Sequence, residues 1–327
     1  MNVLLTGATG FLGQNLKPIL SKSYDVFGVG SSWDLRNQDK CRKLLAHVKP
    51  DVVVHAAGTV GGIGANKENP GKFMYENLIM GTNIIHETMK QKISKFILLG
   101  TVCAYPKHTK VPFKEQDIWD GYPEETNAPY GIAKKALMKM VDTYHEQYDM
   151  NGVNLIPVNM YGPYDHFNLT SSHVIPALIL KVGRAIKENN KSITLWGTGQ
   201  ASREFLYAPD CAEAIKLSIE KNISPDPINI GTGKEIKICE LIETIVDIMG
   251  FDGIINYDDS KPDGQPRRCL DISKARDLLG FEAKTTLRQG LINTIKWFNQ
   301  SNSNKGSSWK SFSDDLLSEL GIDNNVE

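Results

Sequence analysis

Tyr130 and Lys134 are two side chains whose types and spacing suit proton transfer. They stand four residues apart in a stretch with a helical pattern, so we expect them on one helix face. An ammonium group near a phenol favours the phenolate and lowers the phenol's pKa, so the tyrosine could exchange a proton near neutral pH. The same spacing recurs at Tyr257 and Lys261, just before Pro262 in a loop-like stretch. We interpret that second pair as a chance occurrence.

Thr101 provides a hydroxyl beside this pair. It directly follows the apolar run Phe96–Leu99, which reads as a buried strand. The carboxyl ends of parallel strands are where such sheets place ligands. We therefore expect the Thr101 hydroxyl to hydrogen-bond a carbonyl group that is being reduced.

Three glycines, Gly7, Gly10 and Gly13, form a G-x-x-G-x-x-G loop between the first apolar run and the first helical pattern. The first permits a tight turn, the second lets the backbone approach a pyrophosphate, and the third allows close helix–strand packing. The N–H groups at the start of the following helix would bind the anion. This arrangement predicts a dinucleotide cofactor.

The end of the second predicted strand normally selects the form of the nicotinamide cofactor, because an acid there binds the 2′-hydroxyl of NAD. The stretch after Gly28 has no acid until Asp34, which favours NADP(H). No arginine stands there to bind a 2′-phosphate, so NAD(H) is not excluded. Ser31 and Ser32 are the available donors, and Asp34 is better placed to meet the adenine.

The elements that position these residues alternate along the first half of the chain. Continuous apolar runs separated by helical patterns are typical of a parallel sheet covered on both faces. We therefore predict an α/β fold, a Rossmann-type doubly wound parallel sheet with a smaller interwoven C-terminal substrate lobe. The predicted strands are 3–6, 25–28, 51–55, 96–99, 154–158, 193–196 and 228–230, and the predicted helices are 38–47, 71–92, 128–149, 172–189, 210–220, 237–249 and 285–299.

The domain boundaries follow from where this alternation loosens. We assign residues 1–160 and about 200–230 to the dinucleotide-binding domain. Residues 161–199 and 231–298 then form the substrate lobe. Residues 299–327, which begin with a stretch rich in Ser, Asn and Lys, are expected to be a flexible tail.

Composition excludes several classes of partner. The chain has 327 residues, a formal charge of −1 and 41% hydrophobic residues. It lacks the basic excess of a nucleic-acid binder and any apolar run of the roughly 20 residues that a membrane span needs. No signal-peptide pattern or C-x-x-C pair is present, so we expect a reduced, cytoplasmic protein without disulfides or metal. The cysteines are Cys41, Cys103, Cys211, Cys239 and Cys269.

Several longer segments carry a resemblance to a known family. Over about residues 2–298 the chain resembles the extended short-chain dehydrogenase/reductases and, more narrowly, the GDP-L-fucose synthase family of epimerase/reductases. The matching segments are A-A-G-T-V-G-G-I (56–63) with Asn66, Pro70 and Asn77, C-A-Y-P-K (103–107), N-M-Y-G-P-Y-D (159–165), S-H-V-I-P-A-L-I (172–179), W-G-T-G (196–199), R-E-F-L (203–206) and P-D-G (262–264).

The resemblance implies a role for each matched residue. Tyr130 would be the general acid with Lys134 as its partner, Thr101 stands where the family usually has Ser, and Cys103 and His173 match the residues assigned to epimerisation. Substrate contacts are implied for Lys181, Trp196, Arg203 and Asp263. Cofactor contacts are expected for Gly7, Thr9, Gly10, Phe11, Leu12, Gly13, Ser31, Ser32, Asp34, Leu35, Ala56, Ala57, Gly58, Lys134, Pro157, Asn159, Met160 and His173.

The implied activity is the NADPH-dependent epimerisation and reduction of a GDP-4-keto-6-deoxy sugar by a homodimer that pairs through the helices near 71–92 and 128–149. The chain departs from the family at Gly28 and Gly30, where arginines are expected, and at Thr9. Three alternatives remain open: a C4-reductase that does not epimerise a GDP-4-keto-hexose or GDP-4-keto-heptose, a 4-epimerase or dehydratase with tightly bound NAD(P), and a non-catalytic nucleotide-binding module.

Overall fold

The computed structural model describes residues 1–168, 172–261 and 263–303. The first residues of the expected tail, 299–303, belong instead to helix α10 (Leu287–Ser303). This helix buries Leu291, Ile295 and Phe298. The rest of the expected tail, 304–327, lies outside the described residues.

The large sheet has six parallel strands in the order β2-β1-β3-β4-β5-β9. Its central strands are buried along their whole length, which explains why they read as continuous apolar runs. The strands are β1 (Asn2–Thr6), β2 (Asp25–Val29), β3 (Val52–His55), β4 (Lys95–Leu99), β5 (Gly152–Pro157) and β9 (Ile228–Ile230).

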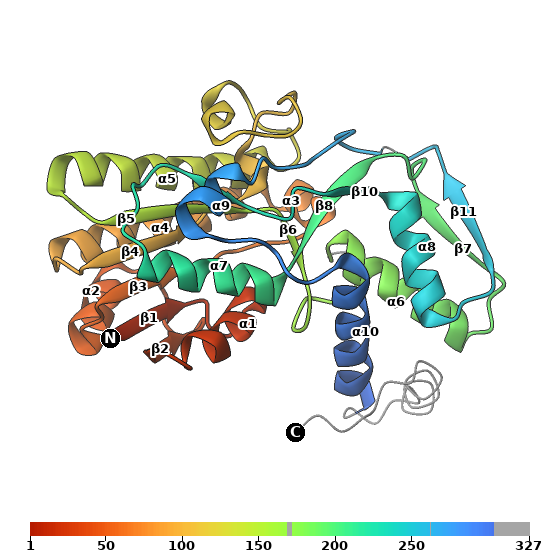
Figure 1. Cartoon of the computed structure of the whole chain (residues 1–327), viewed down its shortest axis with the longest axis horizontal. Coiled ribbons are helices and arrows are strands. Elements are labelled where there is room, and N and C mark those ends of the chain that lie inside the picture. The colour runs from red at the N-terminus through yellow and green to blue at the C-terminus, as the bar shows by residue number, and fades with distance from the viewer. Residues whose placement is uncertain (169–171, 262, 304–327) are drawn as a thin grey trace.

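Helices cover both faces of this sheet (Figure 1), which confirms the doubly wound prediction. One face carries α1 (Phe11–Leu20) and α7 (Ala208–Glu220), which pack on each other. The other face carries α2 (Gln38–Val48), α4 (Pro70–Lys90) and α5 (Ala128–Tyr148). A short α3 (Ile63–Glu68) precedes α4, and α9 (Ser273–Leu279) lies beside β9.

A second hydrophobic core lies beyond the carboxyl edge of the large sheet, to the right in Figure 1. It is built around two small sheets. Their strands are β10 (Glu235–Lys237), β8 (Ser202–Tyr207) and β6 (Asn159–Tyr161) in one, and β11 (Ile254–Asp258) with β7 (Ser192–Trp196) in the other. Helices α6 (Val174–Lys187), α8 (Ile238–Met249) and α10 complete this core.

Two expectations about this half of the chain were wrong. Leu270, Ala275, Leu279 and Phe281 pack into the first core, although their segment was assigned to the substrate lobe. Tyr257 lies in strand β11, not in a loop. Strands β6, β8, β10 and β11 and helices α3 and α9 were not predicted. β6, β10, α3 and α9 are short, while β8 and β11 lack a clear apolar alternation.

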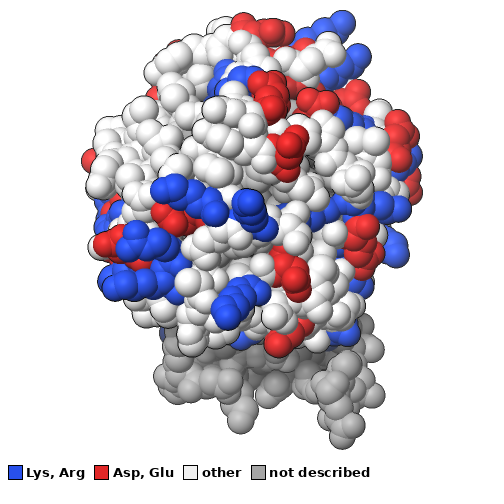
Figure 2. Space-filling view, turned by 90° about the vertical axis from the view of Figure 1, so that its left-hand side faces the viewer, with Lys and Arg blue, Asp and Glu red and all other residues white. Residues whose placement is uncertain are grey.

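The surface carries charges of both signs. Figure 2 shows the face on the left of Figure 1, where cationic and anionic side chains are interspersed with uncharged ones. Over its described residues, this face therefore lacks the uniformly positive surface that attracts a phosphate backbone. Among the helices that the structure describes, none is both long and apolar enough to cross a bilayer.

Glu204 ties the two cores together. Its fully buried carboxylate accepts hydrogen bonds from the backbone N–H groups of Leu270 (2.7 Å), Gly233 (2.8 Å) and Thr232. Its own N–H donates to the carbonyl oxygen of Arg268, at 3.1 Å. Because the carboxylate is buried, its pKa is raised, while these backbone donors oppose that shift.

We predict that Glu204→Ala lowers the free energy of unfolding by about 3 kcal/mol or more, because it strands several buried N–H donors. Chemical denaturation measures this loss. Glu243→Ala, at an exposed position of α8, is the matched control and should change the same quantity by less than about 0.5 kcal/mol. Equal stabilities of the two variants would contradict the assignment.

Candidate functional site

A glycine loop at the carboxyl edge of the large sheet joins β1 to α1. Strand β1 pairs with β2 on one side and with β3 on the other, so the strand order reverses direction at this loop. Open α/β sheets bind their ligands at such a point. Gly7 has a φ of +72°, and a Cβ there would lie 2.7 Å from the nitrogen of Ala57. A Cβ on Gly13 would lie 2.1 Å from the oxygen of Gly7. The residues present therefore form a backbone cradle that fits a dinucleotide pyrophosphate.

The residues predicted to contact the cofactor lie at the carboxyl ends of neighbouring strands. Pro157 ends β5, and Asn159 begins β6 with its side-chain amide donating to the carbonyl oxygen of Glu204 at 3.0 Å. Thr9, Gly10, Phe11 and Leu12 form the β1–α1 connection and the first turn of α1, residues 31–35 follow β2, residues 56–58 follow β3, and Met160 lies within β6.

The expected adenosine end of the site contains an arginine that the sequence reasoning missed. Arg36 forms ion pairs with Asp34 (2.8 Å) and with Glu76 on α4 (3.0 Å). Its hydrogen bond lowers the pKa of the Asp34 carboxyl. Thr9 packs against Gly30, where a Cβ would lie 2.5 Å from the threonine hydroxyl. Ser31 and Ser32 are exposed beside them.

Gly131 brings the predicted catalytic residues together. Helix α5 approaches the short 3-10 turn Val102–Ala104 so closely that a Cβ on Gly131 would lie 2.3 Å from the carbonyl oxygen of Cys103. Tyr130, the preceding residue on α5, is hydrogen-bonded by the Thr101 side chain. The Thr101 hydroxyl also accepts from the Cys103 N–H at 3.2 Å. Thr101, Cys103 and Tyr130 therefore form one cluster.

The electrostatics of Tyr130 differ from the sequence-based expectation. Burial raises its pKa, the nearby Cys103 adds to that rise, and the Thr101 hydrogen bond opposes it. The expected lowering by Lys134 is absent because the lysine ammonium donates instead to the carbonyl oxygen of Leu99, at 3.0 Å. Burial lowers the pKa of Lys134 to about 8. Tyr130 is thus held as a neutral phenol, the form that can donate a proton.

His55 lies behind Lys134 and was also missed. It is buried at the end of β3, and its Nδ1 is 2.9 Å from the Thr6 hydroxyl. Burial and, to a smaller extent, the positive charge of Lys134 together lower its pKa to about 3. The neutral ring therefore places no second positive charge beside the lysine. Its only sequence signal is a polar residue that ends an apolar run.

Cys103 faces two guanidinium groups. Arg268 Nη1 lies 3.8 Å from the Cys103 sulfur. Arg203 is held by the carbonyl oxygens of Ser202 (2.7 Å) and Asp263 (3.4 Å). Burial and, to a smaller extent, the charge of Arg268 together lower the pKa of Arg203 to about 10. The sequence reasoning named Arg203 but missed Arg268.

His173 stands apart from this cluster in sequence, as the residue before α6. The residue as a whole is exposed to solvent. Desolvation of its ring by the surrounding protein and the charge of the neighbouring His166 lower its pKa, so the neutral imidazole is favoured. No contact joins it to Cys103 in the structure, so their expected partnership across a sugar ring stays a prediction.

The predicted substrate residues lie on and beside the β7–β11 sheet. Trp196, at the end of β7, is 74% exposed, so one ring face is available for a flat ligand. Lys181 donates to the carbonyl oxygen of Thr194, at 2.5 Å. Asp263 accepts from the Thr198 backbone N–H and hydroxyl, both at 2.7 Å. Both of its carboxylate oxygens therefore hold the W-G-T-G turn.

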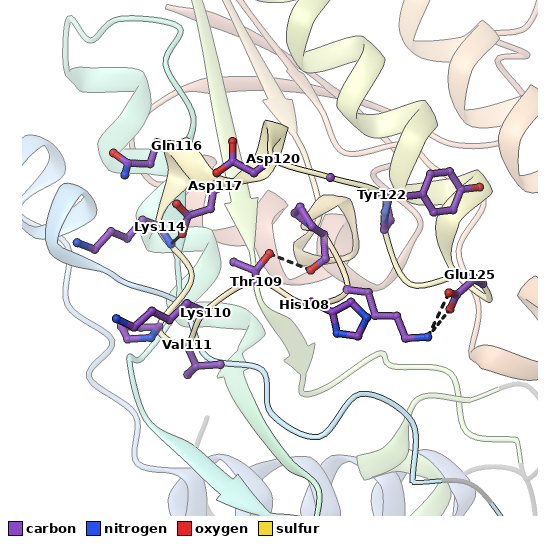
Figure 3. Close-up of a pocket in the computed structure, with 15 residues that line it drawn as sticks. His108, Thr109, Lys110, Val111, Lys114, Gln116, Asp117, Asp120, Tyr122 and Glu125 are labelled. Carbon is purple, nitrogen blue, oxygen red and sulfur yellow. Dashed lines mark hydrogen bonds and ion pairs between the residues drawn. The ribbon is translucent and has the colours of Figure 1, made fainter.

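A cavity of about 850 Å³ lies next to this site, in the segment between the 3-10 turn and α5 (Figure 3). Its walls include Lys107, which forms an ion pair with Glu125 at 2.8 Å, and Thr109. The carbonyl oxygen of Lys107 accepts from the side-chain amide of Gln265. None of the predicted catalytic, cofactor or substrate residues lines this cavity.

Comparison with protein-family models matches residues 3–231 to the NAD dependent epimerase/dehydratase family. The chain belongs to that family. It is 40% identical over 265 residues to a GDP-L-fucose synthase of Sinorhizobium fredii, covering 81% of this chain and 84% of the relative. It is 37% identical over 308 residues to the Escherichia coli GDP-L-fucose synthase, covering 90% and 96%. The resemblance noted in the sequence is confirmed.

Solved structures agree with this assignment. A GDP-6-OMe-4-keto-L-xylo-heptose reductase from C. jejuni superimposes with a TM-score of 0.86 at 27% identity, covering 92% of this chain and 98% of that one. A GDP-L-fucose synthetase from Naegleria fowleri bound to NADP superimposes with a TM-score of 0.84 at 27% identity, covering 92% and 95%. The predicted fold class is thereby confirmed.

Asp165, in the loop after β6, was not predicted to titrate unusually. Burial raises its pKa to about 7, against which only the His166 N–H acts. Its other carboxylate oxygen is buried without a hydrogen-bond partner among the described residues. The folded state therefore binds this proton more tightly than the unfolded state does.

We predict that Asp165→Asn removes a pH dependence of stability. In the parent protein the Asp165 contribution is present below its ordinary pKa of 3.8 and is lost as the pH rises toward 7. The variant should gain unfolding free energy over the parent between pH 4 and pH 7, by about 1.4 kcal/mol per pKa unit. Asp252→Asn, at an exposed position, should show no such gain. Parallel stability curves for D165N and the parent would refute the prediction.

Proposed function

We propose that this protein is an NADP(H)-dependent 3,5-epimerase/4-reductase of a GDP-4-keto-6-deoxy sugar. The observation that carries the proposal is the cluster of Thr101, Cys103 and Tyr130 beside the glycine cradle. A cofactor pocket alone would serve any dehydrogenase. Two hydroxyl groups can hydrogen-bond the oxygen of a ketone while it is reduced. A thiol beside them can remove a proton from the carbon next to that ketone.

Tyr130 and Thr101 act on the ketone oxygen. Bound NADPH supplies a hydride to C4. The Tyr130 phenol, kept neutral by burial, donates a proton to the O4 oxygen, while Thr101 hydrogen-bonds the same oxygen. Lys134, charged below its lowered pKa of about 8, would hold the ribose hydroxyls of the cofactor.

Cys103 and His173 serve the epimerisation. The C4 ketone acidifies the C–H bonds at C3 and C5, and inversion requires a base on one face of the ring and an acid on the other. Cys103 would take the proton, and His173 would return one from the opposite face. Thr101 and Tyr130 stabilise the enolate oxygen that forms between these two steps.

The GDP group would bind on the second core. The exposed Trp196 ring offers a stacking face for the guanine, and Lys181 and Arg203 offer positive charge to the diphosphate. Asp263 serves this subsite by holding the turn after Trp196, because both of its carboxylate oxygens are bonded to Thr198.

A second candidate function is C4 reduction without epimerisation, on a GDP-4-keto-hexose or GDP-4-keto-heptose. It is favoured by the structural similarity to the C. jejuni heptose reductase, with its TM-score of 0.86. The orientation of Cys103 and His173 toward the sugar decides between the two functions.

We also propose a cytoplasmic homodimer. Helices α4 and α5 lie side by side on the outer face of the large sheet, and Tyr75 and Tyr148 on them are exposed. Two such pairs would form a four-helix interface. Sedimentation velocity should therefore show a species of twice the chain mass, and a monomer at all micromolar concentrations would contradict this interface.

We predict that Tyr130→Phe lowers the rate of NADPH consumption with a GDP-4-keto-6-deoxy sugar by about 100-fold or more, because the proton donor is lost. Tyr257→Phe is the matched control, since Tyr257 has the same Y-x-x-x-K spacing but lies in β11. It should retain the parent rate. Turnover of Y130F at the parent rate would refute the role of Tyr130, and the absence of turnover in the parent would refute the proposed function.

A further inference from the structure

Arg268 and Gln265 form a buried polar pair next to Cys103. The Arg268 side chain is 9% exposed, and its Nε and Nη2 donate to the Gln265 carbonyl oxygen at 3.2 and 2.9 Å. The Gln265 amide donates in turn to the carbonyl oxygen of Lys107, at 2.9 Å. These contacts fix the plane of the guanidinium and direct its remaining Nη1 toward the Cys103 sulfur, 3.8 Å away.

The charge of Arg268 is not neutralised by a carboxylate. Its sequence neighbour Arg267 is exposed and pairs with Glu235. Among the ion pairs of the described residues, none includes Arg268. The N–H groups of a buried guanidinium need an anion or a strong acceptor: Gln265 accepts from Nε and Nη2, and Nη1 faces the Cys103 sulfur. The thiol of Cys103 is the group nearby that can become that anion.

Other charged or titratable groups face Cys103 from two elements. Tyr130 approaches from α5 and Arg203 from β8, and both interact electrostatically with the cysteine. Tyr130 is a neutral phenol at physiological pH, so it adds no charge. Arg203 acts in the same direction as Arg268 but is itself held by Asp263. The two charged side chains named here that interact with Cys103 are therefore both guanidinium cations.

We propose that Arg268 is a positioning residue that holds Cys103 as a thiolate aimed at the sugar ring. The thiolate takes the proton from the carbon next to the C4 ketone, and the electron pair of that C–H bond moves to the ketone oxygen as an enolate. The thiol and the enolate are formed together, so charge is conserved and no oxidant or reductant is needed. Proton abstraction from the sugar rests on the proposed epimerase function. Formation of the Cys103 thiolate does not depend on that function.

Alkylation by iodoacetamide measures the thiolate directly, because only the thiolate reacts. Mass spectrometry gives the rate at Cys103 as a function of pH for the parent and for Arg268→Gln, Arg268→Lys and Arg267→Gln. R268Q should react about tenfold more slowly at pH 7, with its pH midpoint moved upward by about one unit. R268K should recover most of the rate, and R267Q should match the parent. Equal Cys103 profiles for R268Q and the parent would overturn the proposal.

Cys239, a half-buried cysteine on α8, is the internal control for folding. Its alkylation profile should be the same in all four proteins. If Cys103 and Cys239 shift together, Arg268 has only a structural role and the proposal is overturned.

Solvent exchange separates this inference from the proposed function. In D₂O without cofactor, the parent should incorporate deuterium at C3 or C5 of the sugar, and R268Q should do so about tenfold more slowly at pH 7. No exchange in the parent would refute epimerisation, while the alkylation profiles would still decide whether Arg268 holds the thiolate. Equal exchange in R268Q and the parent would overturn the role of Arg268.

Discussion

The buried carboxylate of Glu204 is the interaction on which the substrate half of the site depends. It accepts hydrogen bonds from backbone donors of two separate segments and so ties both to strand β8. Its neighbours in the chain and in space are Arg203 and Arg268, the two guanidinium groups that face Cys103. A carboxylate without any direct chemical role thus helps to set the positions of the two guanidinium groups that interact with Cys103.

The cofactor half depends on a different constraint, the absence of side chains at contact points. Gly7 and Gly13 keep the β1–α1 loop and β3 close enough to form a pyrophosphate cradle, and Gly131 lets α5 contact the turn that carries Cys103. The two halves meet at Cys103. The cofactor half sets its backbone position, and the substrate half supplies the charged groups around it. This convergence supports the proposal that proton transfer and hydride transfer take place at one sugar ring.

Much of this arrangement could be predicted from the sequence. The large sheet follows from continuous apolar runs, and the convergence of Thr101 with Tyr130 follows from strand ends in a parallel sheet. Arg268 and Gln265 could not be found in this way, because they lie in a loop whose path depends on tertiary contacts with Glu204 and Lys107. The raised pKa of Tyr130 was missed because it results from burial of the phenol, which residue spacing does not show.

Electrostatic details depend on burial, which sequence spacing does not reveal. The Y-x-x-x-K pattern places Lys134 on the correct helix face, yet its ammonium reaches the Leu99 carbonyl. Asp263 matches a substrate residue by position, yet its carboxylate holds a turn.

We propose that one site inverts the configuration of the carbons next to a ketone and then reduces that ketone. Proton NMR of the product formed from GDP-4-keto-6-deoxymannose and NADPH in D₂O tests it most directly. We expect a sugar that is inverted at C3 and C5, carries deuterium at both carbons and is reduced at C4. A product that is reduced at C4 but retains both original configurations and both original protons would contradict it.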